Sequence, residues 1–287
     1  MKRDIRATLM IFLFIFCCNF VSVSQTKSRK IRKDSLAEIN KVWPRVHADI
    51  GAFYANYNTG IAVGSEQLGI GLNLDIEQAL GLDVNRWSFR GNAQFRLGKT
   101  RKNSIFVGYF GVNRITSKKL KVDLEIGEHT FPLGTTITSR YDITILRLKY
   151  DYAFYQDPRV SIGVSIGAFV MPLRFSVVTD TIEGQSTNFT APFPVVGIRS
   201  DFRISNKVSL RQSAELLFLP LENFSGSVLD LTFCVDYFPF KNFGIGIGVN
   251  SYHFEFTARD TSYPIFDFFG TLTFGYTGAL AFLSFKF

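Results

Sequence analysis

Long segments in which apolar and polar residues alternate one by one dominate the sequence from Val46 to Phe287. In residues 146–154, leucine, tyrosine and phenylalanine occupy the even positions, while Arg147, Lys149 and Asp151 occupy odd ones. The same alternation appears in residues 87–97, 162–170, 196–204 and 229–237. Because successive side chains of a strand point to opposite faces, this pattern predicts strands with one apolar and one polar face. We therefore predict an all-β fold.

Strand length separates the two kinds of all-β protein that would show this pattern. The alternation over residues 137–155 is far longer than the usual ~5–6 residues of strands in soluble sheets. Each apolar run matches the roughly 9–11 residues with which a tilted strand crosses a bilayer. The 31 Phe and 11 Tyr residues suit the aromatic girdles of membrane barrels. Residues 104–116 are ambiguous, because both faces carry apolar residues. A closed antiparallel transmembrane β-barrel is predicted, and a soluble sandwich is the alternative.

The connections between the predicted strands alternate in length. Tight turns are predicted at residues 156–159, 205–207 and 240–242, and longer polar segments at 119–136, 177–192, 220–227 and 257–265. Bacterial barrels have short periplasmic turns and longer outer loops, so this alternation makes the C-terminus periplasmic. One long final strand over 266–287 gives about ten strands, within a range of eight to twelve. A turn at Tyr276–Gly278, or two strands within 46–76, would move the number toward twelve.

The N-terminal residues predict export. A basic start is followed by an apolar stretch to about Phe20, and small residues before Gln25 offer a cleavage site. The chain is therefore divided into a signal peptide (1–24), a periplasmic N-terminal segment (25–45) and an outer-membrane barrel (46–287). Within the N-terminal segment, residues 25–41 are rich in Lys and Arg and are predicted as a solvated leader with one short helix, and docking to anionic lipid or peptidoglycan is the alternative.

Twelve charged residues on the polar faces are predicted to form a charge network in the lumen. They are Arg90, Arg96, Arg147, Lys149, Asp151, Arg199, Asp201, Arg203, Arg211, Glu215, Asp230 and Asp236. Charges away from bulk water are costly unless paired, so the near balance of bases and acids predicts ion pairs that close most of the bore. A barrel of about ten strands is nearer to the filled eight-stranded barrels than to the open porins. A narrow channel that favours anions is the alternative.

Catalysis has weaker support from the sequence. Ser251, His253 and Glu255 share a strand face and are residue types found in hydrolase triads. Residues two apart on a strand stand roughly 6.5–7 Å apart, whereas a proton relay needs about 2.6–3.2 Å. We therefore predict no enzyme and no catalytic residue. A lipid-modifying enzyme that uses Ser251 and His253 is kept as an alternative.

Other kinds of site are also constrained. Surface binding through the mixed-charge outer segments 119–136 and 177–192 is a further alternative. The bases lie across alternating strands and form no continuous patch, so nucleic-acid binding is not expected. His47, His129 and His253 lie far apart and no Cys/His cluster has zinc spacing, so neither metal nor cofactor is predicted. Cys234 is expected to be a small buried side chain.

Several short motifs carry a family resemblance. They are Leu80–Asp83, Phe131–Gly134, Pro194–Gly197, the glycine-rich segment 244–250 and the alternating ending 278–287. Through them the chain from about Val46 to Phe287 resembles small bacterial outer-membrane β-barrel proteins, loosely similar to the outer-membrane-protein-W and outer-membrane-protein-A barrels.

The resemblance implies a location and partners. It implies residence in the outer membrane, with contact to its lipid and lipopolysaccharide. It also implies that Leu283, Phe285 and Phe287 form a signal read by the barrel-assembly machinery. The expected function is a structural or passive small-solute role, with the substrate open.

Overall fold

The computed structural model describes residues 39–65, 70–75, 77, 82–119, 124–126, 129–131, 134–179, 185–220, 224–258 and 270–287. The predicted signal peptide and residues 25–38 lie outside this described part, as do Leu80, Gly81, Pro132 and Leu133 of the family motifs. A helical turn at 39–42 precedes the first strand. No helix among the described residues has the length and hydrophobicity needed to span a bilayer.

The strands are mostly long and follow one another along the chain. They are β1 (Val46–Ser65), β2 (Ile70–Asp75), β3 (Asn85–Leu97), β4 (Asn103–Lys119), β5 (Leu124–Ile126), β6 (His129–Phe131), β7 (Thr136–Gln156), β8 (Val160–Thr179), β9 (Gln185–Arg203), β10 (Val208–Pro220), β11 (Phe224–Tyr237), β12 (Phe243–Ala258) and β13 (Gly270–Lys286).

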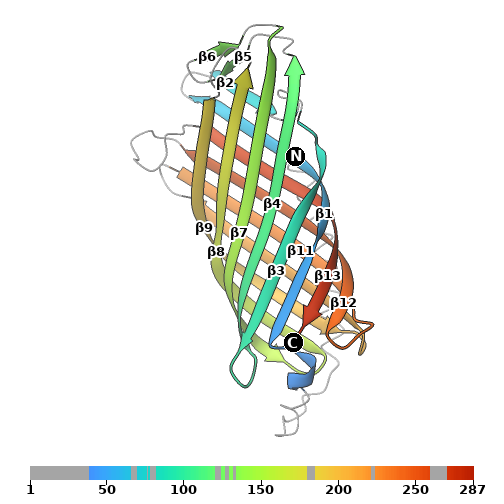
Figure 1. Ribbon diagram of the computed structural model, residues 1–287. Coiled ribbons are helices and arrows are strands. Elements are labelled where there is room, and N and C mark those ends of the chain that lie inside the picture. Colours follow the sequence, from blue (N-terminus) through green and yellow to red (C-terminus); the bar gives the residue numbers. More distant parts are fainter. Residues whose placement is uncertain are drawn as a thin grey trace.

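Ten of these strands close into an antiparallel ring. Its order is β13-β12-β11-β10-β9-β8-β7-β4-β3-β1, and β1 pairs with β13 to complete it (Figure 1). In the described chain β2 pairs with the outer part of β1 alone, while β5 and β6 form a separate hairpin. The predicted barrel of about ten strands is therefore confirmed. Residues 46–76 do hold two strands, but only β1 belongs to the ring, and β13 runs unbroken through Tyr276–Gly278.

Short connections gather at the end of the barrel that carries the C-terminus (Figure 1). The predicted tight turns are present there as the links β7–β8, β9–β10 and β11–β12, and this end is the periplasmic one by the usual rule of short turns. One predicted outer segment is shorter than expected, because β8 continues to Thr179 and β9 begins at Gln185. The parts of the strands beyond the membrane can expose polar side chains to water. A strand can therefore continue through a polar stretch of sequence. Likewise β11 already begins at Phe224, and 259–265 lie outside the described residues.

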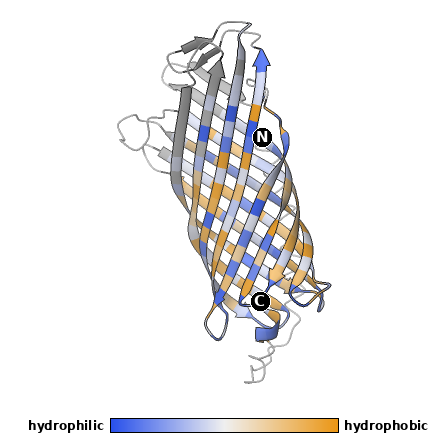
Figure 2. Ribbon diagram, in the orientation of Figure 1, coloured by the Kyte–Doolittle hydropathy of each residue, from blue (hydrophilic) through white to orange (hydrophobic). Residues whose placement is uncertain are grey.

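A belt on the outer wall, hereafter the apolar belt, is formed by exposed apolar residues such as Leu146, Val164, Val196 and Ile247. Hydrophobic residues, coloured orange in Figure 2, alternate with hydrophilic ones along the strands in this part of the barrel. Leu148 is 59% exposed and Ile166 is 62% exposed. So much exposed apolar surface is unfavourable in water but fits lipid. Above the belt, charged side chains also occupy outward positions, as at Arg140 and Asp142, which pair at 3.3 Å.

An apolar core reaches across the lumen above Arg147. It joins buried side chains from β1, β4, β7, β8, β9, β11, β12 and β13 in one cluster. Phe110 on β4 stacks on Tyr276 of β13 with ring centroids 4.7 Å apart, although β3 and β1 separate these strands in the ring. The ambiguity of residues 104–116 is thereby explained, since Ile105 faces outward while Phe110 faces this core. From the sequence we predicted an ionic lumen and no apolar layer within it.

Candidate functional site

Charged side chains fill the periplasmic half of the lumen. The structure places the predicted lumen residues other than Arg203 there, and all of these except Arg211 are buried. His47, Asp49 and Asn250 also join the contacts but were not predicted. We call this set, with the predicted residues other than Arg203, the charged network. The alternation in β1 carried a signal for His47 and Asp49, because both lie on its polar face.

Within the charged network, Arg147 connects strands on opposite sides of the barrel. From β7 it donates through Nε to Asp230 Oδ2 on β11 at 3.0 Å and through a terminal nitrogen to the Tyr276 hydroxyl on β13 at 2.9 Å. Three strands of the ring separate β7 from each of these strands. Its side chain is 2% exposed. One guanidinium therefore ties opposite walls of the barrel together.

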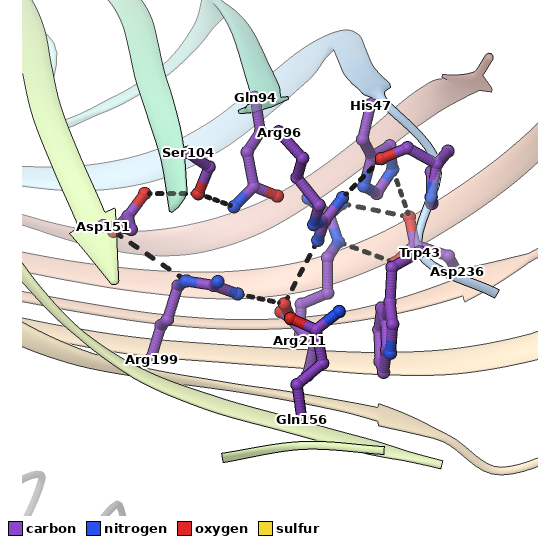
Figure 3. Close-up of polar contacts among 12 residues, drawn as sticks. Trp43, His47, Gln94, Arg96, Ser104, Asp151, Gln156, Arg199, Arg211 and Asp236 are labelled. Carbon is purple, nitrogen blue, oxygen red and sulfur yellow. Dashed lines mark hydrogen bonds and ion pairs between the residues drawn. The ribbon is translucent and has the colours of Figure 1, made fainter. Parts of the chain in front are cut away.

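Two further arginines bridge the bore nearer the periplasmic end (Figure 3). Arg211 on β10 donates to Asp236 Oδ2 at 2.8 Å on the next strand, and it pairs with Asp49 on β1 at 2.9 Å. Arg96 on β3 contacts Asp201 on β9 at 3.4 Å, and Arg199 shares this carboxylate. Ion pairs between strands that are not neighbours in the ring thus stabilise the shape of the barrel.

A polar chamber of about 70 Å³ lies within the charged network. Gln212 lines it, is 2% exposed, and has no hydrogen-bond partner among the described protein atoms on either end of its amide. A terminal nitrogen of Arg147 likewise has no hydrogen-bond partner among the described protein atoms. Buried polar groups are normally hydrogen-bonded, and the chamber is polar and roomy enough for water. It therefore suits bound water or a small polar solute.

Residues 39–45 fold across the periplasmic end and form what we call the N-terminal clasp. Trp43 is 5% exposed and its indole donates to the Asp157 carbonyl at 2.8 Å. The Arg101 guanidinium donates to the carbonyls of Asn40 at 2.6 Å and Trp43 at 2.5 Å. Trp43, which follows the predicted leader of residues 25–41, thus has a buried site on the barrel end.

Arg101 itself has an unusual backbone. Its φ is 54°, a left-handed conformation that is uncommon for a residue with a side chain. Burial, and then the nearby Arg45, lower the pKa of its guanidinium, which still stays charged in water. A strained position that places a charged donor on two carbonyls points to a holding role.

Loss of this holding contact gives a testable result. Arg101→Ala should speed tryptic cleavage after Lys41 and Arg45 by roughly tenfold or more, because charge-assisted hydrogen bonds contribute about 1.5–3 kcal/mol. Limited proteolysis in detergent followed by mass spectrometry measures the rate. Arg140→Ala, at the far end, is the control. Equal rates for both variants would mean that Arg101 does not hold the clasp.

A pocket of about 360 Å³ opens at the periplasmic end beside the clasp. We call it the periplasmic pocket, and its walls are residues 41–44, the turns after β9 and β11, and the end of β13. Arg203, predicted for the lumen network, lies here instead and donates to Asn206 Oδ1 at 2.7 Å. Its position at the last residue of β9 carries it out of the bore to the rim.

A further buried ion pair, separate from the charged network, lies at the outer end. Arg114 is fully buried, and it donates to Glu77 Oε1 at 2.6 Å and to Thr59 Oγ1 at 3.0 Å. Tyr57 and Tyr141 lie against the guanidinium at 5.3 and 4.8 Å. No local pattern revealed this pair, because Glu77 comes from the connection between β2 and β3.

The candidate catalytic set faces outward above the apolar belt. Ser251 bonds to Thr277 at 2.9 Å, and His253 lies 3.9 Å from Glu255. The strand neighbours of His253 are Gly275 and Leu229, and no hydrogen bond between Ser251 and His253 is formed in the described chain. The structure thus does not bring a nucleophile to the imidazole. Within the described residues, no group of three or more His, Cys, Asp or Glu side chains is arranged to hold a metal ion.

The C-terminal residues Leu283 and Phe287 point outward and are exposed, and Phe285 packs beside Phe243 with ring centroids 5.5 Å apart. Recognition of these residues by an assembly machinery stays a prediction. Cys234 is buried, with a free thiol.

No protein-family model and no curated protein matches the sequence, whereas several solved structures are similar to this barrel. The outer membrane protease OmpT from Escherichia coli is similar with a TM-score of 0.53 at 11% identity, covering 84% of this chain and 96% of that one. The fold is that of a bacterial outer-membrane β-barrel. Together with the apolar belt, it places this barrel in the outer membrane.

Other solved barrels match with lower TM-scores. The transport unit of the autotransporter AIDA-I from Escherichia coli has a TM-score of 0.41 at 7% identity, covering 90% of this chain and 100% of that one. The attachment invasion locus protein Ail of Yersinia pestis has a TM-score of 0.33 at 11% identity, covering 82% and 99%.

Proposed function

We propose that this protein is a non-conducting outer-membrane barrel, a rigid membrane scaffold rather than a passage for solutes. The observation that carries the proposal is the stacking of Phe110 on Tyr276 within an apolar core that reaches across the bore. Of the two roles expected from the sequence, this packing supports the structural one over the passive channel.

Two layers of different chemistry support a closed bore. An ion that passed the apolar core would lose its hydration among buried aromatic side chains such as Phe53 and Phe274, which costs several kcal/mol or more. Below that core, Arg147 and Arg211 would have to leave carboxylates on distant strands. Opening would therefore break packing and buried ion pairs together.

Planar-bilayer recording tests the proposal. The folded wild-type protein is expected to give no stepwise currents in concentrated KCl, and a Phe53→Ala/Phe110→Ala/Tyr276→Ala variant is expected to give them. These three rings pack on one another, and we expect their removal to open a path toward the polar chamber. Heat-modifiable gel mobility confirms that each preparation is folded. Defined conductance steps from the wild type alone would end the proposal, whatever the variant does.

The apolar belt and the C-terminal residues indicate which partners this scaffold has. We infer contact of the apolar belt with membrane lipid and lipopolysaccharide, and assembly through Leu283, Phe285 and Phe287. Ser251 and His253 do not favour an enzyme, and we propose no catalytic role for them.

A further inference from the structure

We propose that the periplasmic pocket binds a soluble organic anion that carries several negative charges on phosphate or carboxylate groups. This inference goes beyond a scaffold role and does not depend on it. It rests on the charge of the pocket, on its apolar floor and on its place inside the ring.

The pocket has a large excess of positive charge. Seven lysines and arginines line it, with Asp201 as the one acid among its described lining residues. Arg96 is paired with Asp201, and Arg211 with Asp49 and Asp236. Five bases remain, and within the described chain none of them forms an ion pair: Lys41, Arg203, Lys207, Lys241 and Lys286. A single cavity lined by one sign of charge attracts and concentrates the opposite ion.

The five bases are graded from rim to interior. Lys41, Lys207 and Lys241 are exposed, whereas Arg203 and Lys286 are half-buried. An anion from the periplasm would meet the exposed ammonium groups first and then the Arg203 guanidinium. Arginine can hold phosphate or carboxylate through two parallel hydrogen bonds, and lysine contributes a point charge. Several such donors in one pocket favour an anion with several charges over chloride.

Apolar side chains form the floor of the pocket. Trp43 and Phe238 are buried and line it, and the Lys286 ammonium sits 3.6 Å from the centre of the Phe238 ring. The volume of about 360 Å³ lies within the range of small-molecule pockets, roughly 300–1,000 Å³. These walls would contact the organic body of the ligand, and Trp43 makes the site dependent on the docked N-terminal clasp.

The location selects a soluble ligand over a lipid headgroup. The pocket opens on the inner side of the ring, between the clasp and the turns after β9 and β11. The apolar belt lies on the opposite side of the same strands, as Leu283 on β13 shows by facing outward. A lipid anchored in the bilayer around the belt would have to leave it to place its phosphate among these bases.

Trp43 provides a built-in reporter. The chain has two tryptophans, so Trp87→Phe leaves Trp43 as the only one. In this background the full chain, folded in a neutral detergent, is titrated with inorganic pyrophosphate and with citrate at constant ionic strength. We expect a saturable change in Trp43 fluorescence for at least one of these anions. Lys207→Met/Lys241→Met should weaken the affinity by about tenfold or more, because both lost charges face the same anion.

Matched controls separate site binding from general charge. Lys99→Met removes a lysine from another periplasmic turn outside the pocket and should change the affinity by less than about twofold. Unchanged thermal unfolding shows that each variant is folded, and calorimetry detects binding away from Trp43. The proposal is overturned by absence of saturable binding of both anions, by equal weakening in the control, or by binding only to phosphatidylglycerol vesicles. A wild type that conducts would instead end the scaffold proposal and leave this site standing.

Discussion

Replacing Arg147 by methionine is expected to destabilise the folded barrel by about 3–5 kcal/mol, because a buried carboxylate is left without its partner. Asp230 loses its 3.0 Å contact with the guanidinium, and the Tyr276 hydroxyl loses its donor at the same time. The free energy of unfolding in urea, followed in detergent by tryptophan fluorescence and gel mobility, measures the loss.

The matched control for Arg147 lies on the same strand. Arg140→Met removes a side chain that is 55% exposed and pairs with Asp142 at 3.3 Å, so its cost should stay below about 1 kcal/mol. A double variant, Arg147→Met/Asp230→Leu, should recover at least half of the loss, because it removes both charges rather than one. A cost for Arg147→Met no larger than that for Arg140→Met would contradict the idea that cross-bore ion pairs hold the ring.

Glu77→Ala is the second substitution with a large expected effect, again about 3–5 kcal/mol. Arg114 is fully buried, and Glu77 is its charged partner at 2.6 Å. The same carboxylate accepts the Thr59 backbone amide at 2.8 Å and the Thr59 hydroxyl at 2.8 Å, so three donors lose their acceptor together. Urea unfolding of the purified barrel gives the value.

Two further variants isolate the charge from the shape of Glu77. Glu77→Gln keeps the size and some hydrogen bonds and should cost less than Glu77→Ala but more than a surface change. Glu255→Ala, at an exposed carboxylate 3.9 Å from His253, should cost well under about 1 kcal/mol. If Glu77→Ala and Glu255→Ala have equal effects, the buried pair does not stabilise the outer end.

Much of the barrel was predictable because strand alternation is a local property. Leu148 and Arg147 are neighbours in sequence, and the period of two alone assigns one to the lipid and the other to the lumen. Turn chemistry likewise located the links at residues 156–159 and 205–207. Length then favoured a membrane barrel, and closure of β1 on β13 agrees with it.

The mistaken expectations have a common origin. Phe110 and Tyr276 lie on the inward face, where a polar lumen was expected, and no local pattern shows that inward rings from several strands meet. Arg203 was assigned to the bore by alternation, although the strand ends at that residue and leaves it at the rim. The N-terminal clasp was missed because Trp43 finds its partner on Asp157, in a turn far along the chain.

The sequence by itself determined the all-β barrel of about ten strands and, where residues alternate, the face of the strand on which each side chain lies. Only the tertiary structure decided which charges pair, as Arg147 does with Asp230 across 83 residues of chain, and where apolar side chains close the bore. The physical reason is that alternation fixes the face of each side chain, whereas the register between strands and the closure of the ring fix its height and the side chain opposite it.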